Sequence, residues 1–333
     1  MNAPASRHLA LDPALVEAYR RDGVVRIRSA LPRRRIDALR AAVDRQFAER
    51  ARSATAYDFQ DVAAQIFGGD APLDLAGATR FDMKAYRAAV KRDDAARPLV
   101  DAPLTASVPP GQFFYQAAGW RAHPEIRGVA LDSDLPEIAA VLLDALYVNF
   151  WEDTTFIKTP GAVQRTAFHQ DKGYFQISGD KCCVVWIALD DVDADNGALE
   201  YVRGSHRWGE EFAPNVFFAQ TPLPGATGPR LPDIEGDRER FDIVRIDAEI
   251  GDVIVHDVLT VHGAGGNRTA DRNRRAISFR YCGDDIRYFE KPGAIPQIGV
   301  ESSIEDGAPL ASRDYPLVWP RPFPGAELSR LFD

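Results

Sequence analysis

The strongest constraint on the fold is a change in the pattern of the sequence after Leu146. From there to about residue 281, short runs of strand length and strand composition alternate with clusters of Gly, Asp, Asn and Pro. Many short strands separated by turns are typical of a β-sandwich or a barrel. The strands predicted in this region cover residues 147–151, 154–158, 182–189, 198–202, 252–256 and 274–281.

Helical patterns precede the strands. A first helix is predicted between Asp12, which can cap it, and Gly23, which can end it. A strand follows at 24–28, and apolar residues at helical spacing predict further helices over 33–50 and 135–145. Helices first and strands second predict an α+β fold, mainly β, in which helices cover one face of an antiparallel sheet.

The chain of 333 residues could form one or two domains. We expect a single domain over residues 1–333, with mostly helical support in 1–145 and a β core in 146–290. The Pro-rich segment 291–333 is expected to be a tail wrapped over this body. Hydrophobic residues make up 45% of the chain, enough for a sizeable core.

Charge and targeting patterns exclude several classes of partner. The net charge of −9 disfavours binding to nucleic acid or to anionic membranes. No apolar run is long enough for a membrane helix, and the first ten residues lack a signal-peptide pattern, so we expect a cytoplasmic protein. The spacing of Cys182, Cys183 and Cys282 fits neither a disulfide framework nor a zinc site, which predicts reduced core cysteines. The oligomeric state stays open.

Three residues could form a metal site. His169 and Asp171 are two positions apart, so on an extended segment both side chains leave the same face. His262 follows the apolar strand around 251–255 and precedes glycines that let the chain turn. Two histidines and one carboxylate form the facial triad of non-haem Fe(II) enzymes, which leaves positions open for O2 and a co-substrate. The alternatives are a surface His-Asp pair and a buried histidine bonded to a carbonyl group.

A basic strand at 274–281 could bind the co-substrate. Alternation places Arg274 and Ser278 on one face of this strand and Arg275 on the other. A buried arginine requires a carboxylate partner, which a dicarboxylate such as 2-oxoglutarate would supply, and Ser278 could donate a further hydrogen bond. The alternative is that this basic run is a solvated edge strand.

Taken together and in order, these motifs resemble the phytanoyl-CoA dioxygenase family of Fe(II)/2-oxoglutarate oxygenases. The resemblance extends from about residue 19 to residue 281. The motifs that carry it are YRRDGVV (19–25), FHQDKGYF (168–175), Trp186, NGAL (196–199), GSH (204–206), GD (251–252), HG (262–263) and RRAIS (274–278).

The resemblance implies a double-stranded β-helix, or jelly roll, backed by the N-terminal helices. It implies that His169, Asp171 and His262 bind Fe(II) and that Arg274 binds the distal carboxylate of 2-oxoglutarate. Trp186 is expected beneath the site, either touching 2-oxoglutarate or packing in the core. The implied reaction uses O2 to hydroxylate a C–H bond of a small organic substrate, with release of succinate and CO2.

Two positions depart from the family pattern. Ala264 stands where a serine is common, and Arg274 follows His262 by one residue more than expected. The Ala-Ile-Ser that follows favours Arg274 over Arg275 as the anchor. Asp171 argues against halogenation, because halogenating relatives replace this carboxylate by a small residue.

Four further polar residues have open or subordinate roles. Lys158 and Gln164 could reach the mouth of the barrel or be solvated. His206 is expected in a structural loop and His256 in a capping or core role, so neither is predicted to bind the metal.

Two other functions compete with the oxygenase. A cupin-like metal enzyme could use the same triad without 2-oxoglutarate, but it would have no need for Arg274. A non-catalytic jelly-roll binding module would have no reason to leave metal positions open. The substrate stays open, since the family acts on acyl-CoA esters, compatible solutes and natural-product intermediates.

Overall fold

The computed structural model describes residues 11–68, 82–105, 107–294, 297, 299–310 and 312–320. The expectations about residues 1–10, and about the tail beyond residue 320, therefore lie outside the described residues. The helices are α1 (Pro13–Asp22), α2 (Arg33–Glu49), α3 (Phe59–Phe67), α4 (Met83–Arg92), α5 (Pro124–Asp132) and α6 (Leu135–Leu143). The strands are β1 (Val24–Ile27), β2 (Ala56–Asp58), β3 (Phe113–Ala117), β4 (Val148–Lys158), β5 (Thr166–His169), β6 (Ile177–Ser178), β7 (Cys182–Ala188), β8 (Leu199–Val202), β9 (Ile243–Ile246), β10 (Val253–Asp257), β11 (His262–Ala264), β12 (Arg274–Gly283), β13 (Arg287–Tyr288) and β14 (Leu317–Trp319).

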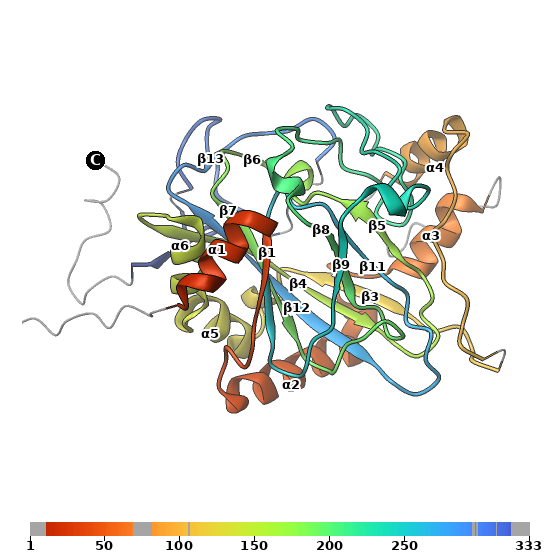
Figure 1. The fold of residues 1–333 in the computed structure, drawn as a ribbon, viewed down its shortest axis with the longest axis horizontal. Helices are drawn as coiled ribbons and strands as arrows, with labels where there is room; N and C mark the ends of the chain where they lie inside the picture. Colours follow the sequence, from red (N-terminus) through yellow and green to blue (C-terminus); the bar gives the residue numbers. More distant parts are fainter. Residues whose placement is uncertain are drawn as a thin grey trace, which may run out of the picture.

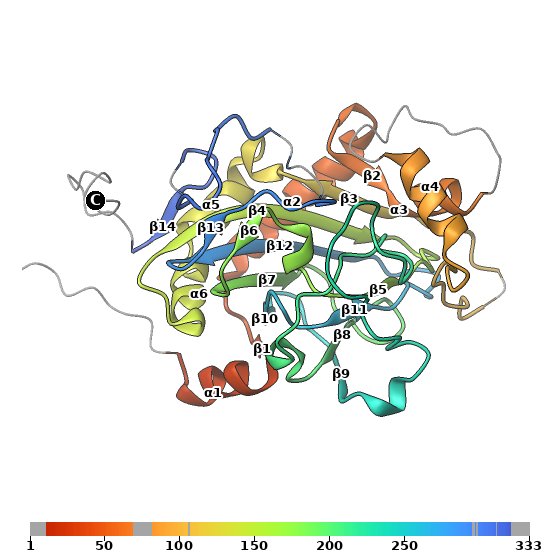
Figure 2. The same cartoon turned by 90° about the horizontal axis from the view of Figure 1, so that it is seen from above.

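The strands form a jelly roll of two facing antiparallel sheets. The major sheet has the order β1-β10-β7-β12-β4-β3-β2, with β14 beside β4, and the minor sheet has the order β5-β11-β8-β9. Figure 2 shows the minor-sheet strands on one side of β12 and β4, while α2 and α5 lie on the other side. This confirms the predicted α+β fold with a mainly β core.

The outer face of the major sheet packs against helices and forms the main core. On β12, Ile277 and Phe279 point to this side and are fully buried in one cluster with Leu39 and Val43 of α2. Each such side chain stabilises the fold by roughly 1.5–3 kcal/mol. Helices α3 and α4 lie at the other end of the molecule from α5 and α6 (Figure 1).

Local signals placed the first helix correctly. The Asp12 carboxylate accepts a hydrogen bond from the Ala14 N–H at 2.9 Å, and α1 ends at Gly23 in the left-handed conformation with φ 76°. A Cβ atom at Gly23 would lie 2.4 Å from both His206 and Thr260, so this turn requires glycine.

One expectation about the strands was wrong. The predicted strands 147–151 and 154–158 are one continuous strand, β4, because the buried carboxylate of Asp153 accepts backbone N–H groups from Gly119 and Trp120 at 3.1 and 2.8 Å. Besides its helices, the segment 1–145 contributes the predicted strand β1 and also β2 and β3, which extend the major sheet.

The described part of the tail lies against the sheet. Strand β14 pairs with β4, and Tyr315 stacks on Trp151 with ring centroids 4.6 Å apart. All three cysteines are buried and free, as expected. Among the described residues, the helices are too short or too polar to cross a membrane.

Candidate metal centre

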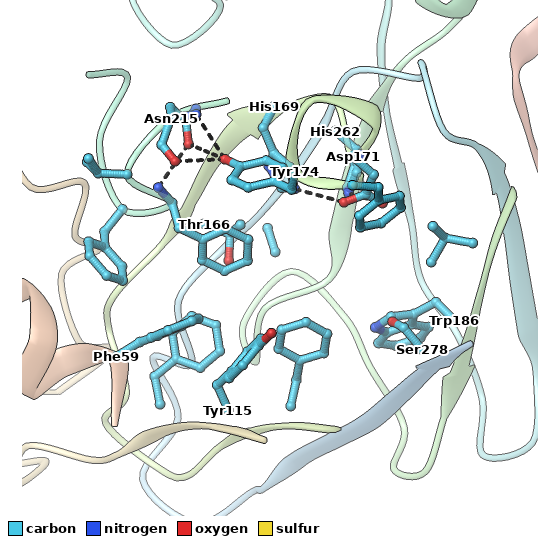
Figure 3. A pocket seen from close by; sticks show the side chains of 18 of the residues that line it. Phe59, Tyr115, Thr166, His169, Asp171, Tyr174, Trp186, Asn215, His262 and Ser278 are labelled. Atoms are coloured by element: carbon cyan, nitrogen blue, oxygen red, sulfur yellow. Dashed lines mark hydrogen bonds and ion pairs between the residues drawn. The ribbon is translucent and has the colours of Figure 1, made fainter. Parts of the chain in front are cut away.

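Three side chains meet in the space between the two sheets. His169 ends β5, His262 begins β11, and the two residues are paired across these neighbouring strands. Nε2 of His169 lies 3.6 Å from Oδ1 of Asp171, and Nε2 of His262 lies 3.8 Å from Oδ2. One ligand atom from each of the three residues falls within 4.8 Å of the others, a suitable arrangement for one metal ion (Figure 3).

The backbone brings these groups together differently from what the spacing predicted. Asp171 is not part of an extended segment: its φ of −74° and ψ of −32° are helical, so the chain turns after His169 and returns the carboxylate toward the imidazole. His262 follows the apolar strand β10, as expected, but it belongs to a different sheet. It begins β11, after the segment between Asp257 and His262 has crossed from the major to the minor sheet.

The backbone also fixes the orientation of both imidazole rings. Nδ1 of His169 lies 2.8 Å from the Ala167 carbonyl oxygen, and Nδ1 of His262 lies 2.9 Å from that of Thr260. A carbonyl oxygen only accepts, so each Nδ1 carries the proton and each Nε2 presents a lone pair. Both lone pairs are therefore available to a metal ion.

The electrostatics of the site match this protonation. Burial alone would raise the pKa of Asp171, but His262, His169 and His256 hold it well below its usual range. Burial, together with His169 and His256, lowers the pKa of His262 well below its usual value. At neutral pH the site thus offers a carboxylate and neutral imidazole, the forms that bind metals.

His256 has a larger role than the sequence indicated. It is buried on β10, with Nε2 at 3.1 Å from Oδ2 of Asp171 and Nδ1 at 3.1 Å from the Tyr201 hydroxyl. The Asp171 carboxylate only accepts, so Nε2 of His256 carries the proton and donates to it, and Nδ1 accepts from the Tyr201 O–H. His256 therefore orients the carboxylate and stays outside the set of three ligand residues, as expected.

Arg274 points into the same cavity without an ion-pair partner. It is 2% exposed, its Cζ lies 5.0 Å from the Trp186 ring centroid, and its Nε has no hydrogen-bond partner among the residues that the structure describes. Within the described part of the chain, no carboxylate lies within 4.0 Å of its guanidinium, and burial lowers the pKa of Arg274 to about 10. Ser278 and Trp186 are paired on β12 and β7 and line the same wall.

Arg275 faces the opposite way, as alternation predicted. Its Nε and Nη2 donate to Asp190 at 2.9 and 2.6 Å, and its Nη1 donates to Asp44 of α2 at 2.8 Å. The alternative of a solvated edge strand is wrong, because β12 is a central strand of the major sheet.

Lys158 and Gln164 are structural residues. Both are buried, and neither lines the cavity. Nζ of Lys158 donates to the carbonyl oxygens of Gln164 and Gly265 at 2.9 and 2.7 Å and lies over the Phe113 ring. His206, also expected to be structural, donates from Nε2 to the Arg20 carbonyl oxygen at 3.1 Å.

Aromatic side chains close one side of the cavity, whose volume is about 140 Å³. We call them the aromatic wall: Phe59, Phe113, Tyr115, Phe156, Phe217 and Phe218. Phe59 of α3 stacks on Tyr115 of β3 with centroids 4.8 Å apart, and the Phe217 ring lies 5.1 Å from Phe59 and 5.2 Å from His169. In Figure 3, Phe59 and Tyr115 lie on one side of the cavity, and Trp186 and Ser278 on the other. No sequence motif predicted this wall, because its residues come from segments without a chemical motif.

Comparison with known proteins gives consistent results. The family model described as phytanoyl-CoA dioxygenase (PhyH) matches residues 19–276. A probable phytanoyl-CoA dioxygenase of Caenorhabditis elegans is 29% identical over 143 residues, 42% of this chain and 44% of the relative. The human peroxisomal phytanoyl-CoA dioxygenase is 26% identical over 151 residues, 44% of this chain and 43% of the relative. These matches span less than half the length of the curated relatives.

Solved structures share the fold. The non-heme alpha ketoglutarate dependent carbocyclase SnoK from nogalamycin biosynthesis superposes with a TM-score of 0.61 at 23% identity, covering 92% of this chain and 96% of SnoK. EctD from S. alaskensis, solved with 2-oxoglutarate and 5-hydroxyectoine, gives a TM-score of 0.55 at 18% identity and covers 86% and 80% of the two chains.

Proposed function

Because the chain belongs to the phytanoyl-CoA dioxygenase family, we propose that it is an Fe(II)- and 2-oxoglutarate-dependent oxygenase that hydroxylates a C–H bond of a small organic molecule. In this reaction the bound iron and 2-oxoglutarate supply the oxidising chemistry: one atom of O2 enters the substrate as a hydroxyl group, and the other enters succinate as CO2 is released. We further propose that residues 1–333 form one oxygenase domain, since strands from both halves of the chain build the major sheet.

The metal is assigned to His169, Asp171 and His262. Two neutral imidazole nitrogens and one carboxylate oxygen suit Fe(II), and a set of three ligands leaves coordination positions for the co-substrate and O2. His256 and Tyr201 keep the Asp171 carboxylate oriented through the hydrogen bonds described above.

The observation that carries the co-substrate assignment is the unpaired guanidinium of Arg274. A buried cation without a partner carboxylate is costly, and a bound dicarboxylate would supply the partner. Ser278 lines the same cavity and would donate a hydrogen bond to the same carboxylate, and Trp186 would form one side of the 2-oxoglutarate site.

Arg274 also weighs against a cupin-like enzyme that does not use 2-oxoglutarate, because such an enzyme leaves the guanidinium unpaired. A non-catalytic binding module is disfavoured by the metal-binding geometry of the three ligand residues. Asp171 supplies the third metal ligand, which favours hydroxylation over halogenation.

The test starts without oxygen. Protein is loaded with Fe(II), and 2-oxoglutarate binding is measured by calorimetry for wild type and for Arg274→Ala, with the surface variant Arg203→Gln as control. We expect Fe(II)-dependent binding that Arg274→Ala weakens and Arg203→Gln preserves. Oxygen and a metabolite extract are then added, and succinate formation is followed together with products heavier by one oxygen atom. Iron binding without 2-oxoglutarate binding would favour the cupin-like enzyme.

A further inference from the structure

A second arginine lies on the cavity face of β12. Arg280 follows Arg274 by six positions, lines the same cavity and is 7% exposed. The strand register aligns Arg280 with Val184 of β7 and with Glu152 of β4, and Val184 with His256 of β10. Arg280 therefore lies level with His256, two strands away across β7, at the end of the cavity away from Arg274.

The guanidinium of Arg280 has unused donors. Its Nη1 donates to the Thr154 hydroxyl and its Cζ lies 5.5 Å from the Phe175 ring centroid, but its Nε has no hydrogen-bond partner in the described part of the chain. Among the described residues, no carboxylate lies within 4.0 Å of it. By contrast, Arg165, which is also largely buried, forms ion pairs with three carboxylates at 2.9 to 3.0 Å. An unpaired buried guanidinium facing a cavity indicates an acceptor group on the ligand.

Glu152 is the neighbour of Arg280 on β4, and it is also 7% exposed and lines the cavity. In the described part of the chain, its carboxylate accepts no hydrogen bond and forms no ion pair with Arg280. The same end of the cavity thus offers donors on one strand and acceptors on the next. A ligand that satisfies both residues carries a carboxylate beside a hydrogen-bond donor.

The aromatic wall would receive the rest of the ligand. Along β4, the cavity face continues from Glu152 through Thr154 to Phe156, which is paired with Tyr115 of the aromatic wall. The proposed 2-oxoglutarate site occupies the neighbouring strands β12 and β7, so the two molecules would lie side by side. The metal-ligand residues are close to the aromatic end of this path, since the His169 ring lies 5.2 Å from that of Phe217.

We propose that Arg280 binds the carboxylate of the substrate and Glu152 an adjacent ammonium or hydroxyl group, so that the substrate is an α-amino or α-hydroxy acid with an apolar, ring-bearing side chain. The assignment of this molecule as the oxidised substrate rests on the proposed function. The flat aromatic side chains of the wall favour a ring over a flexible chain.

The test uses four probes with the same phenyl ring: L-phenylalanine, L-3-phenyllactate, 3-phenylpropionate and L-phenylalaninamide. Each is titrated into protein saturated with Fe(II) and 2-oxoglutarate without oxygen, so that the Arg274 site is already filled. Loss of one charge-assisted bidentate contact corresponds to about a ten- to hundred-fold change in Kd. We expect L-phenylalanine or L-3-phenyllactate to bind at least about tenfold more tightly than L-phenylalaninamide. Whichever of these two acids binds more tightly shows whether the group beside the carboxylate is an ammonium or a hydroxyl group.

Variants then assign the effect to residues. Arg280→Gln should abolish the preference for acid over amide, Arg280→Lys should keep part of it, and Glu152→Gln should remove the advantage of L-phenylalanine or L-3-phenyllactate over 3-phenylpropionate. Arg203→Gln is the matched surface control, since Arg203 pairs only with exposed Asp242 among the described residues. The acid-to-amide comparison on wild type needs no variant, so it stands even if a variant misfolds.

Equal affinity for acids and amide, or no binding of any probe, would overturn the inference. Failure of the proposed function gives a different result, because 2-oxoglutarate binding is measured before any probe is added. Intact 2-oxoglutarate binding without a preference for acids contradicts only the role of Arg280.

Discussion

Replacing the two neighbouring arginines of β12 separates co-substrate binding from folding. Arg274 is buried in the cavity that the metal-ligand residues line, and among the described residues it has no carboxylate partner. Arg274→Ala therefore removes its contact with the Trp186 ring and the predicted contact to 2-oxoglutarate, but no ion pair. A charge-assisted bidentate contact is worth roughly 1.5–3 kcal/mol, so we expect the KM for 2-oxoglutarate to rise by about ten- to more than a hundred-fold. The free energy of unfolding should stay equal or increase, because an unpaired buried cation is removed.

Arg275→Ala should give the opposite result. Its partner Asp190 has a side chain that is only 14% exposed, whereas its partner Asp44 is 57% exposed, so the contact to Asp190 carries most of the effect. Asp190 keeps the backbone N–H of residue 275 and a longer contact to Arg40 at 3.5 Å. We therefore expect a loss of about 1–2 kcal/mol in the free energy of unfolding and little change in KM.

Two measurements decide between these effects. Urea unfolding gives the free energy of unfolding, and the KM for 2-oxoglutarate is measured with iron saturating. Arg274→Lys serves as an intermediate, because it keeps the charge but lacks the planar fork of donors. A large rise in KM for Arg275→Ala, with little change for Arg274→Ala, would mean that the co-substrate binds on the Arg275 face of β12, and it would refute the assignment to Arg274. If neither variant changes KM, the protein does not anchor 2-oxoglutarate in this way and the cupin-like enzyme is favoured.

The other predictions concern the metal site and the pH dependence of stability. Three alanine variants, His169→Ala, Asp171→Ala and His262→Ala, should each abolish turnover and leave the circular dichroism spectrum unchanged. Full activity in any one of them would remove that residue from the metal site. Tyr201→Phe frees Nδ1 of His256 and should weaken Fe(II) binding by roughly tenfold in competition with a chelator, whereas an unchanged affinity would mean that the hydrogen bond to Asp171 does not matter. Burial raises the pKa of Asp153 to about 7, so its contribution to stability is lost as the pH rises from about 4 to 7. In urea unfolding, the stability of wild type relative to Asp153→Asn should therefore fall by about 2–3 kcal/mol between pH 5 and 7.5, and a constant difference would contradict the raised pKa.

Features set by local interactions were predictable from the sequence. The cap at Asp12 and the left-handed Gly23 depend on residues within one turn of the helix. The alternation that buries Arg274 and turns Arg275 toward α2 depends only on strand geometry. The convergence of His169, Asp171 and His262 was expected, although the backbone path that achieves it was not.

Features set by distant residues were not predictable in this way. Glu152 and Asp153 resemble a break between strands, and only the N–H groups of Gly119 and Trp120, more than 30 positions earlier, explain why β4 continues. His256 carries a signal that could have been used: it is an inward residue on a predicted strand, two positions beyond Ile254 on the same face. Its contact with Asp171, however, depends on how the two sheets face each other.

The aromatic wall is encoded apart from the metal site. Phe59 and Tyr115 belong to the N-terminal half, Phe217 and Phe218 belong to the segment after β8, and none of these stretches contributes a metal ligand. Mutations in them can reshape the cavity while the ligand residues and Arg274 stay unchanged. Substrate preference can therefore diverge between relatives through drift in these segments alone, with the oxidative chemistry inherited intact. A shared set of metal ligands predicts a shared reaction type, but not that this chain and its relatives oxidise the same molecule.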